Sequence, residues 1–389
     1  MTTLEPWDPD DGAARASRLF TQRYDEPPGV VTAAPGRVNL LGEHTDYNAG
    51  LCLPIALPHA TYAAARARDD GRVRLVSGEG GKVWDGNLDR LPTAEGWAAY
   101  AGGVVWALGE AGHPVNGIDV AVSGCVPLGS GLSSSAALEC SVGLAVLALS
   151  GVPDGPGSRR TLADAGIRAE TEVAGAPTGG MDQTIAVLGR PGHALLLDCR
   201  SWETRQVPFD PGAAGLELLV VDTRVHHALN DGAYAARRAD CEQAAQQLGL
   251  ASLREASEGD LARLTDERVR RRARHVVTEI VRVSETVQAL GANDWAGVGR
   301  LMLTSHASMR DDFEISCPEL DQVVATATEH GAVGARMTGG GFGGSAIALV
   351  PTGVVDEVRS AVDDAFAANG WRAPWHLRAR ASEAARVVG

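Results

Sequence analysis

The sequence is nearly without lysine: Lys82 is the only one, and arginine supplies the remaining side chains of the Lys/Arg pair. A Walker-type phosphate loop needs a lysine followed by serine or threonine, whereas Lys82 is followed by Val83. The chain therefore has no phosphate loop of that kind. Its formal net charge of −14 also argues against a general nucleic-acid-binding protein, which needs a basic surface to bind phosphates.

Long apolar runs and paired cysteines are missing as well. The longest apolar run, around residues 142–149, is too short to span a bilayer. The N-terminus is acidic and lacks the apolar segment of a secretory signal. Six cysteines are scattered singly without a CxxC pair, which is typical of buried thiols in a reducing cytoplasm. We therefore expect a cytoplasmic protein with neither a membrane nor a nucleic-acid partner; a monomer is slightly favoured.

The length of 389 residues is large for one hydrophobic core, so two domains are expected. Hydrophobic residues at 44% and charged residues at 22% are typical of globular chains. Strand-rich character gives way to helices near residue 205, which predicts domains at 1–205 and 206–389. The predicted fold class is α+β.

Hydrophobic periodicity and turn residues predict the secondary structure. Strands are expected at 29–34, 73–77, 118–123, 194–198 and 216–223. Helices are expected at 11–24, 134–150, 161–173, 233–248, 267–290, 295–309 and 318–330. Ser316 with Glu319 three residues later predicts a capping box at the start of the last helix. The arginine-rich stretch 268–274 is expected to form a solvated helix face.

The first motif spans residues 36–47 and reads Gly-Arg-Val-Asn-Leu-Leu-Gly-Glu-His-Thr-Asp-Tyr. It crowds Arg37, Asn39, Glu43, His44 and Asp46 into one short stretch after a predicted strand. A loop with a fixed cation, two carboxylates and an imidazole is suited to a charged or polyhydroxylated ligand. On composition alone, a surface loop with a solvated ion pair is the alternative.

Two glycine-rich motifs follow: the second motif spans residues 127–139 and the third motif spans residues 336–345. In Pro127-Leu-Gly-Ser-Gly-Leu-Ser-Ser-Ser-Ala136, two glycines allow close backbone approach and the serines open a helix, which suits a phosphate. A serine N-cap after a glycine turn is the structural alternative. The segment 336–345 contains Gly-x-Gly-x-x-Gly, yet it leads into a strand, and only a short C-terminal tail remains. A dinucleotide-binding unit is therefore disfavoured.

Taken in order, these motifs resemble those of the galactokinases, in the kinase superfamily named for galactose, homoserine, mevalonate and phosphomevalonate. Glu170 to Gln183, with Gly-x-Met-Asp-Gln at its end, and Asn230 to Tyr234 match the same family. The resemblance covers nearly the whole chain. Two departures are minor: Leu41 where isoleucine is usual, and Thr178-Gly179-Gly180 ahead of Met181-Asp182.

The resemblance implies a two-domain architecture with a mixed-sheet N-terminal domain, a helix-rich ferredoxin-like C-terminal domain and the active site between them. It also implies roles for individual residues, although without it Glu170 reads as a helix-surface acid and Asp182 as a turn residue. The implied catalytic residues are Asp182 and Arg37. The implied sugar-binding residues are Glu43, His44, Thr45, Asp46, Gly179 and Tyr234. The implied nucleotide-binding residues are Gly129, Ser130, Gly131, Leu132, Ser133, Ser134, Ser135 and Trp97, with Trp97 expected at the adenine. The implied Mg²⁺ ligands are Ser135 and Glu170.

The activity implied is ATP- and Mg²⁺-dependent phosphorylation of the anomeric hydroxyl of α-D-galactose, in galactose metabolism by the Leloir pathway. A kinase for a related small alcohol, such as N-acetylgalactosamine, would share the phosphate loops; the first motif argues against mevalonate. Some galactokinase relatives are non-catalytic sugar sensors. Known sensors have lost residues of the Ser-Ser-Ser-Ala segment, whereas residues 133–136 are intact here.

Overall fold

The computed structural model describes residues 2–226 and 230–388. Its strands are β1 (Thr2–Thr3), β2 (Val30–Asn39), β3 (Leu51–Cys52), β4 (Pro54–Ala67), β5 (Arg72–Ser77), β6 (Val83–Asn87), β7 (Ile118–Gly124), β8 (His193–Asp198), β9 (Thr204–Pro208), β10 (Leu216–His226), β11 (Gly334–Thr338), β12 (Gly343–Pro351), β13 (Trp375–Ala379) and β14 (Arg386–Val387). Its α-helices are α1 (Pro9–Tyr24), α2 (Trp97–Glu110), α3 (Ser134–Leu149), α4 (Pro156–Arg168), α5 (Met181–Leu188), α6 (Asn230–Leu248), α7 (Glu267–Gly291), α8 (Trp295–Ser308), α9 (Pro318–Glu329) and α10 (Val355–Ala368).

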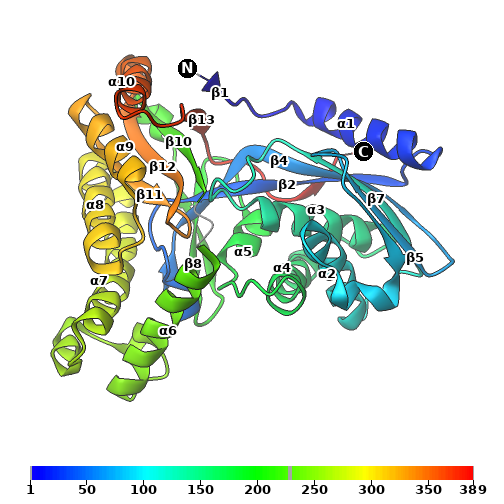
Figure 1. Cartoon of the computed structure of the whole chain (residues 1–389), viewed down its shortest axis with the longest axis horizontal. Coiled ribbons are helices and arrows are strands. Elements are labelled where there is room, and N and C mark those ends of the chain that lie inside the picture. The colour runs from blue at the N-terminus through cyan, green and yellow to red at the C-terminus, as the bar shows by residue number, and fades with distance from the viewer. Residues whose placement is uncertain (1, 227–229, 389) are drawn as a thin grey trace.

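Two larger sheets and one small sheet organise these elements (Figure 1). The N-terminal half holds a six-stranded sheet of order β14-β2-β4-β7-β5-β6, with α1 on one face and α2, α3 and α4 on the other. The C-terminal half holds a five-stranded sheet of order β1-β13-β10-β12-β11. The third sheet, β3-β8-β9, has three strands. The α+β class is thereby confirmed.

Each end of the chain pairs with a strand in the sheet of the opposite half. Strand β1 pairs with β13 in the C-terminal sheet, and β14 pairs with β2 in the N-terminal sheet. Each end therefore ties its own half to the sheet of the other half. The boundary near residue 205 remains a prediction.

Strand β10 separates two hydrophobic cores by its two faces. Leu219 and Val221 pack into a core with α6, α7, α9 and α10, whereas Leu218 and Val220 pack into a second core. This alternation is the period-two pattern of a strand. The second core also contains Val38 of β2, so the N-terminal and C-terminal halves share one continuous apolar interior.

Most predicted elements are confirmed within a few residues, and two of them differ in their bounds. Strand β2 runs through Arg37 to Asn39, so the first motif begins inside a strand and is not a pure loop. The predicted helix 161–173 begins earlier, at Pro156, and its last turn is a π-helix at Ala169–Val173. Of the six cysteines, Cys125 is half-buried and the others are buried, all as free thiols.

Two local predictions are wrong. Ser316 does not cap α9; its hydroxyl donates to Asp321 instead, and Cys317 occupies the cap position without a side-chain bond. The arginine-rich stretch is only partly solvated, because Arg272 is 2% exposed and is paired with Glu314. A buried arginine needs such a partner, which an isolated stretch of sequence does not reveal.

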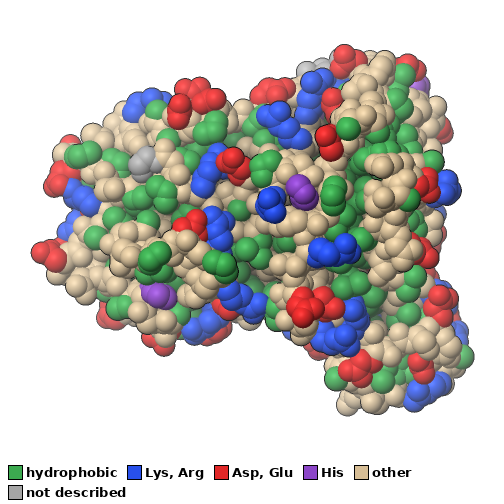
Figure 2. Space-filling view, turned by 180° about the vertical axis from the view of Figure 1, so that it is seen from behind, with side chains coloured by type: hydrophobic (Ala, Val, Ile, Leu, Met, Phe, Trp, Pro, Cys, Tyr) green, Lys and Arg blue, Asp and Glu red, His purple; other side chains and the backbone are tan. Residues whose placement is uncertain are grey.

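Acidic and basic side chains are interspersed over the face seen in Figure 2, which presents no continuous basic surface. Within the described part of the chain, no helix combines the length and the apolar character needed to cross a bilayer.

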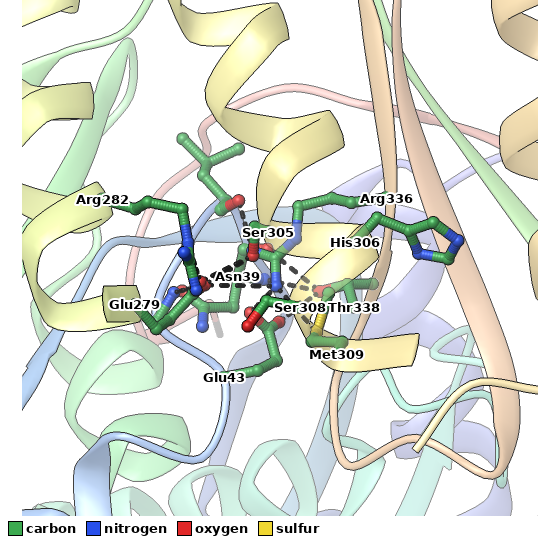
Figure 3. Close-up of polar contacts among 12 residues, drawn as sticks. Asn39, Glu43, Glu279, Arg282, Ser305, His306, Ser308, Met309, Arg336 and Thr338 are labelled. Carbon is green, nitrogen blue, oxygen red and sulfur yellow. Dashed lines mark hydrogen bonds and ion pairs between the residues drawn. The ribbon is translucent and has the colours of Figure 1, made fainter. Parts of the chain in front are cut away.

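A buried charged cluster joins the first motif to the C-terminal half (Figure 3). Arg336 of β11 is fully buried, donates to the carbonyl oxygen of Leu40 at 2.6 Å and forms an ion pair with Glu43. A second carboxylate, Glu279 of α7, lies 3.6 Å from the same guanidinium. The motif is therefore anchored from across the molecule.

Glu279 is the centre of this cluster. It accepts hydrogen bonds from the backbone N–H of Gly42 at 2.9 Å, from Ser305 at 2.7 and 2.8 Å, and from Arg282 at 2.7 Å. Burial alone would raise its pKa, but the guanidinium groups of Arg282 and Arg336 outweigh burial and lower the pKa to about 2. Glu279 is thus ionised throughout the physiological range.

We expect Glu279→Met to destabilise the fold by about 3–5 kcal/mol at pH 7, because two arginines would be left buried without this partner. Ser305→Ala is the matched control and should cost about 1 kcal/mol. Since the folded pKa lies below the unfolded value, the contribution of Glu279 is present above pH 4.5 and is lost as pH falls towards 2. Urea unfolding from pH 7 to pH 3 should therefore show the gap between wild type and Glu279→Met narrowing; a gap independent of pH would contradict the assignment.

Candidate active site

A cavity of about 830 Å³ lies between the halves. It draws its lining from the first motif, the segment after α4, the start of α5, one face of α6 and the third motif. The lining residues are Arg37, Glu43, His44, Asp46, Tyr100, Glu170, Ala174, Gly175, Ala176, Pro177, Thr178, Met181, Asp182, Tyr234, Ala235, Arg238, Ala239, Glu242, Gly339 and Gly340. The structure thus brings together the polar residues of segments that lie far apart in the sequence.

Arg37 and Asp182 form a two-pronged pair in this cavity. The Arg37 Nε and Nη2 atoms donate to the two carboxylate oxygens of Asp182, each at 2.8 Å. The remaining Arg37 nitrogen, Nη1, donates to the carbonyl oxygen of Gly131 at 2.6 Å, and the Ser133 hydroxyl also donates to Asp182. Such fork-to-fork geometry fixes orientation as well as charge. The carboxylate therefore has a defined direction next to the second motif.

The backbone explains why Arg37 reaches the second motif. The pairing of β2 with β4 shifts register between Pro35 and Arg37. The backbone N–H of Arg37 then donates to the carbonyl oxygen of Leu132 and not to β4. A side chain on Gly36 would place its Cβ 2.7 Å from that same carbonyl oxygen. Because residue 36 is a glycine, β2 can approach the second motif at Leu132 this closely.

The second motif is a tight loop at the start of α3. Gly129, Gly131 and Ser133 have φ angles of 70°, 73° and 58°, in the left-handed region that glycine adopts most easily. The first N–H groups of α3 follow directly, and no side chain caps them. Unpaired N–H groups at a helix N-terminus favour an anion.

The third motif supports this loop by backbone contact. A Cβ on Gly339 would lie 2.8 Å from the Gly131 oxygen, and a Cβ on Gly344 would lie 2.9 Å from the Ser130 oxygen. The Ser345 hydroxyl also donates to the Ser130 carbonyl at 2.8 Å. The chain continues into strand β12, which excludes the strand-turn-helix of a dinucleotide-binding unit.

A second acidic group adjoins Asp182. Glu170 lies on the π-helical turn after α4, and the nearby Ser135 hydroxyl favours the ionised form of its carboxylate and so acts to lower its pKa. Burial and the charge of Asp182 raise the pKa of Glu170 to about 7. Crowded carboxylates beside a hydroxyl fit a hard divalent cation, whose charge would relieve their repulsion. Within residues 2–226 and 230–388, no cluster of three or more His, Cys, Asp or Glu side chains could hold a metal ion, so any cation here needs hydroxyl, phosphate or water ligands as well.

Asp46 lines another part of the cavity and lies against Gly179. Burial and the charge of Asp182 raise the pKa of Asp46 to about 6. A Cβ on Gly179 would lie 2.2 Å from the Asp46 carboxyl carbon. Gly179 is therefore the residue that makes room for Asp46.

His44 is held as a neutral ring between the motifs. Burial and the neighbouring His275 lower the pKa of His44 to about 3. Its Nε2 lies 3.1 Å from the Gly340 carbonyl oxygen, which can only accept, so Nε2 carries the proton. Its Nδ1 then accepts from the Tyr47 hydroxyl at 2.7 Å. The Tyr234 ring lies beside His44 with a centroid separation of 5.1 Å.

Several predicted residues do not line the cavity, namely Thr45, Trp97, Gly179 and residues 129–135. Glu43 borders the cavity, but its carboxylate is 2% exposed and bonds to Arg336 and to the N–H of Gly339. Thr45 does not line the cavity; its hydroxyl donates to the carbonyl oxygens of residues 42 and 51. Trp97 packs against the N-terminal core, and Tyr100, one turn later on α2, lines the cavity instead.

Some lining residues were not predicted from the sequence. Arg238 and Glu242 extend the face of α6 that begins at Tyr234, and the two are bonded to each other at 3.0 Å. The available signal was the four-residue spacing of positions 234, 238 and 242, because such positions share a helix face. The segment 174–178 carried no comparable pattern.

Three regions of the chain match known families. Residues 18–67 match the galactokinase galactose-binding signature, residues 99–190 match the GHMP kinases N terminal domain, and residues 286–368 match the GHMP kinases C terminal domain. Together they include the first motif, the second motif with Asp182, and the third motif.

Whole-length relatives agree with these matches. The chain is 50% identical to a galactokinase of Streptomyces coelicolor, over 96% of this chain and 98% of that one. It is 41% identical to a galactokinase of Canis lupus familiaris, over 96% of each. Its structure superposes on a Lactococcus lactis galactokinase complexed with galactose with a TM-score of 0.90, at 31% identity over 95% of this chain and 98% of that one. A mevalonate kinase from Methanococcus jannaschii, at 17% identity, 91% and 98% coverage and a TM-score of 0.66, shares the fold. The chain belongs to the galactokinase family of the GHMP kinases.

Proposed function

We propose that this chain transfers the γ-phosphoryl group of ATP to the anomeric hydroxyl of α-D-galactose, giving galactose 1-phosphate. The observation that carries the proposal is the two-pronged Arg37–Asp182 pair, which lies in a cavity near the start of α3, where no side chain caps the first N–H groups. The relatives' name and the galactose complex of the Lactococcus lactis protein support the choice of sugar. ATP use follows from membership of a kinase family.

Phosphoryl transfer needs alignment of the reactants and neutralisation of charge more than covalent help from the protein. Asp182 would accept the proton of the sugar hydroxyl, because its carboxylate is oriented by two bonds from Arg37 and one from Ser133. Arg37 would also stabilise negative charge that develops on the transferring group. Arg37 also donates to the Gly131 carbonyl oxygen, so Asp182 and the phosphate loop are held in a fixed relative position.

The nucleotide phosphates would bind the backbone N–H groups of residues 129–135, aided by the dipole of α3. Ser130 is buried and bonded within the loop, so its contribution would come from its backbone. The adenine would lie towards α2, where Tyr100 lines the cavity, with Trp97 one turn earlier as the candidate predicted from sequence.

Ser135 and Glu170 would hold Mg²⁺, which when bound supplies neutralising charge to the phosphates. Mg²⁺ commonly keeps several waters and takes few protein ligands, which suits one hydroxyl and one carboxylate. The raised pKa of Glu170 supports this assignment, since a nearby cation would favour its ionised form.

The sugar hydroxyls would be bound by Asp46 and Tyr234, with His44, Glu43 and Gly179 shaping that wall. Asp46 offers acceptor oxygens and Tyr234 offers a hydroxyl that can donate or accept. Thr45 would act indirectly, by fixing the turn that carries Asp46. A site that pairs with the C4 hydroxyl of galactose leaves polar groups unmet when glucose binds.

A coupled assay of ADP release tests the function directly. We expect turnover with galactose and a kcat/KM lower on the order of 10⁴-fold with glucose, because of those unmet groups. N-acetylgalactosamine, tested alongside, reports the related-sugar activity. Absence of turnover, with galactose binding retained in calorimetry, would identify a sensor instead.

Asp182→Asn is expected to lower kcat by at least ~10²-fold, because the amide keeps the shape of the carboxylate but cannot accept the proton. Galactose affinity should change little, and isothermal titration calorimetry checks this. Near-normal turnover of the variant would rule out Asp182 as the base.

Gly179→Ala is expected to raise the KM for galactose by up to ~10²-fold, because the new methyl group would displace the Asp46 carboxylate. The KM for ATP should stay close to wild type. Gly157→Ala, in α4, adds the same methyl group where nothing lies within 4 Å and serves as the control. An unchanged galactose KM would remove Asp46 from the sugar site.

A further inference from the structure

One buried amide connects two carboxylates behind the proposed metal site. The Gln183 Nε2 atom donates to Glu170 Oε2 at 2.6 Å and to Glu139 Oε2 at 2.9 Å. Gln183 and Glu139 are both fully buried. The opposite orientation of the amide would aim its oxygen at two carboxylates, so its neighbours fix the donor side towards them.

The local structure is built around this amide. Glu139 lies one turn after Ser135 on α3, so both side chains lie on the same helix face. Gln183 directly follows Asp182 on α5. On α4, a Cβ at Gly166 would lie 2.9 Å from the Gln183 Cγ and 3.2 Å from Glu139 Oε2. The glycine leaves the space that Gln183 and Glu139 occupy.

We propose that Gln183, held in place by Glu139, is a positioning residue that orients the Glu170 carboxylate towards a divalent cation. The inference rests on the proposed metal role of Glu170. The Gln183 amide is the group that donates to that carboxylate, at 2.6 Å, and the nearby Ser135 hydroxyl also favours its ionised form. Outer partners of this kind typically change metal affinity or activity by ~10- to 100-fold when they are removed.

Glu139 acts here as a hydrogen-bond acceptor and not through its charge. The Gln183 amide donates to one of its oxygens, Oε2, and its other oxygen, Oε1, has no hydrogen-bond partner among the described residues. A glutamine at position 139 could present its carbonyl oxygen to the same amide. A methionine could not, although its size is similar.

The test compares cation binding in matched variants. Mn²⁺ binding to the protein with a non-hydrolysable ATP analogue is measured by electron paramagnetic resonance, and Mg²⁺ dependence of turnover is measured in parallel. Gln183→Met and Glu139→Met should weaken cation affinity by ~10- to 100-fold, with turnover partly restored at high Mg²⁺. Glu139→Gln should stay within about threefold of wild type, since the acceptor oxygen is kept.

Cys140→Ala controls for packing damage, because Cys140 is buried beside Glu139 and its thiol faces the backbone oxygen of Gln183, not the amide. It should leave cation affinity unchanged. Thermal unfolding of each variant checks folding; should Gln183→Met not fold, the comparison of Glu139→Met with Glu139→Gln carries the test alone.

Glu170→Ala separates the two levels of the proposal. If Glu170→Ala leaves Mn²⁺ affinity unchanged, both the proposed metal site and the positioning role of Gln183 are wrong. If Glu170→Ala weakens binding while Gln183→Met and Glu139→Met bind normally, the metal site stands and the positioning role is overturned. Equal weakening in Glu139→Gln and Glu139→Met would overturn the acceptor role of Glu139.

Discussion

The buried ion pair between Arg336 and Glu43 is the contact on which the arrangement of the site depends. It joins the first motif to strand β11, and Glu279 shares the same guanidinium group (Figure 3). With Arg282 the cluster contains two guanidinium groups and two carboxyl groups; burial raises the pKa of Glu43, and the neighbouring Arg336 opposes that rise. Networks of this kind add little stability compared with apolar packing, but breaking one member leaves a costly unpaired charge. The cluster thus specifies one relative position of the two halves.

The relative position of the two halves determines whether the residues of the candidate active site lie close together. The Gly339 and Gly344 backbone approaches the second motif so closely that a Cβ at either position would lie within 3 Å of a carbonyl oxygen. Arg37 then spans from β2 to the same loop and to Asp182. Close-packed backbones tolerate little displacement. A shift of the C-terminal half would therefore displace the second motif first and the Arg37–Asp182 pair next.

The sequence predicted the elements and the site residues with unequal success, for identifiable reasons. Long periodic helices such as α7 and the apolar centre of β10 follow from local pattern, and they are confirmed. Ser316 was misassigned because Asp321, five residues away, competes for its hydroxyl. The burial of Arg272 depends on the distant Glu314, and no periodicity encodes such a pairing. The Gln183–Glu139 contact likewise joins positions 44 residues apart, so only the fold reveals it.

The charge of the cavity explains why its parts must act together. Asp46, Glu170 and Asp182 line it, and their mutual repulsion contributes to the raised pKa values of the first two. Arg37 donates to both oxygens of Asp182. A triphosphate entering this space would add negative charge to carboxylates that already repel one another. Positive charge from a bound cation would offset that repulsion, which is why the acidic groups and a cation would act together.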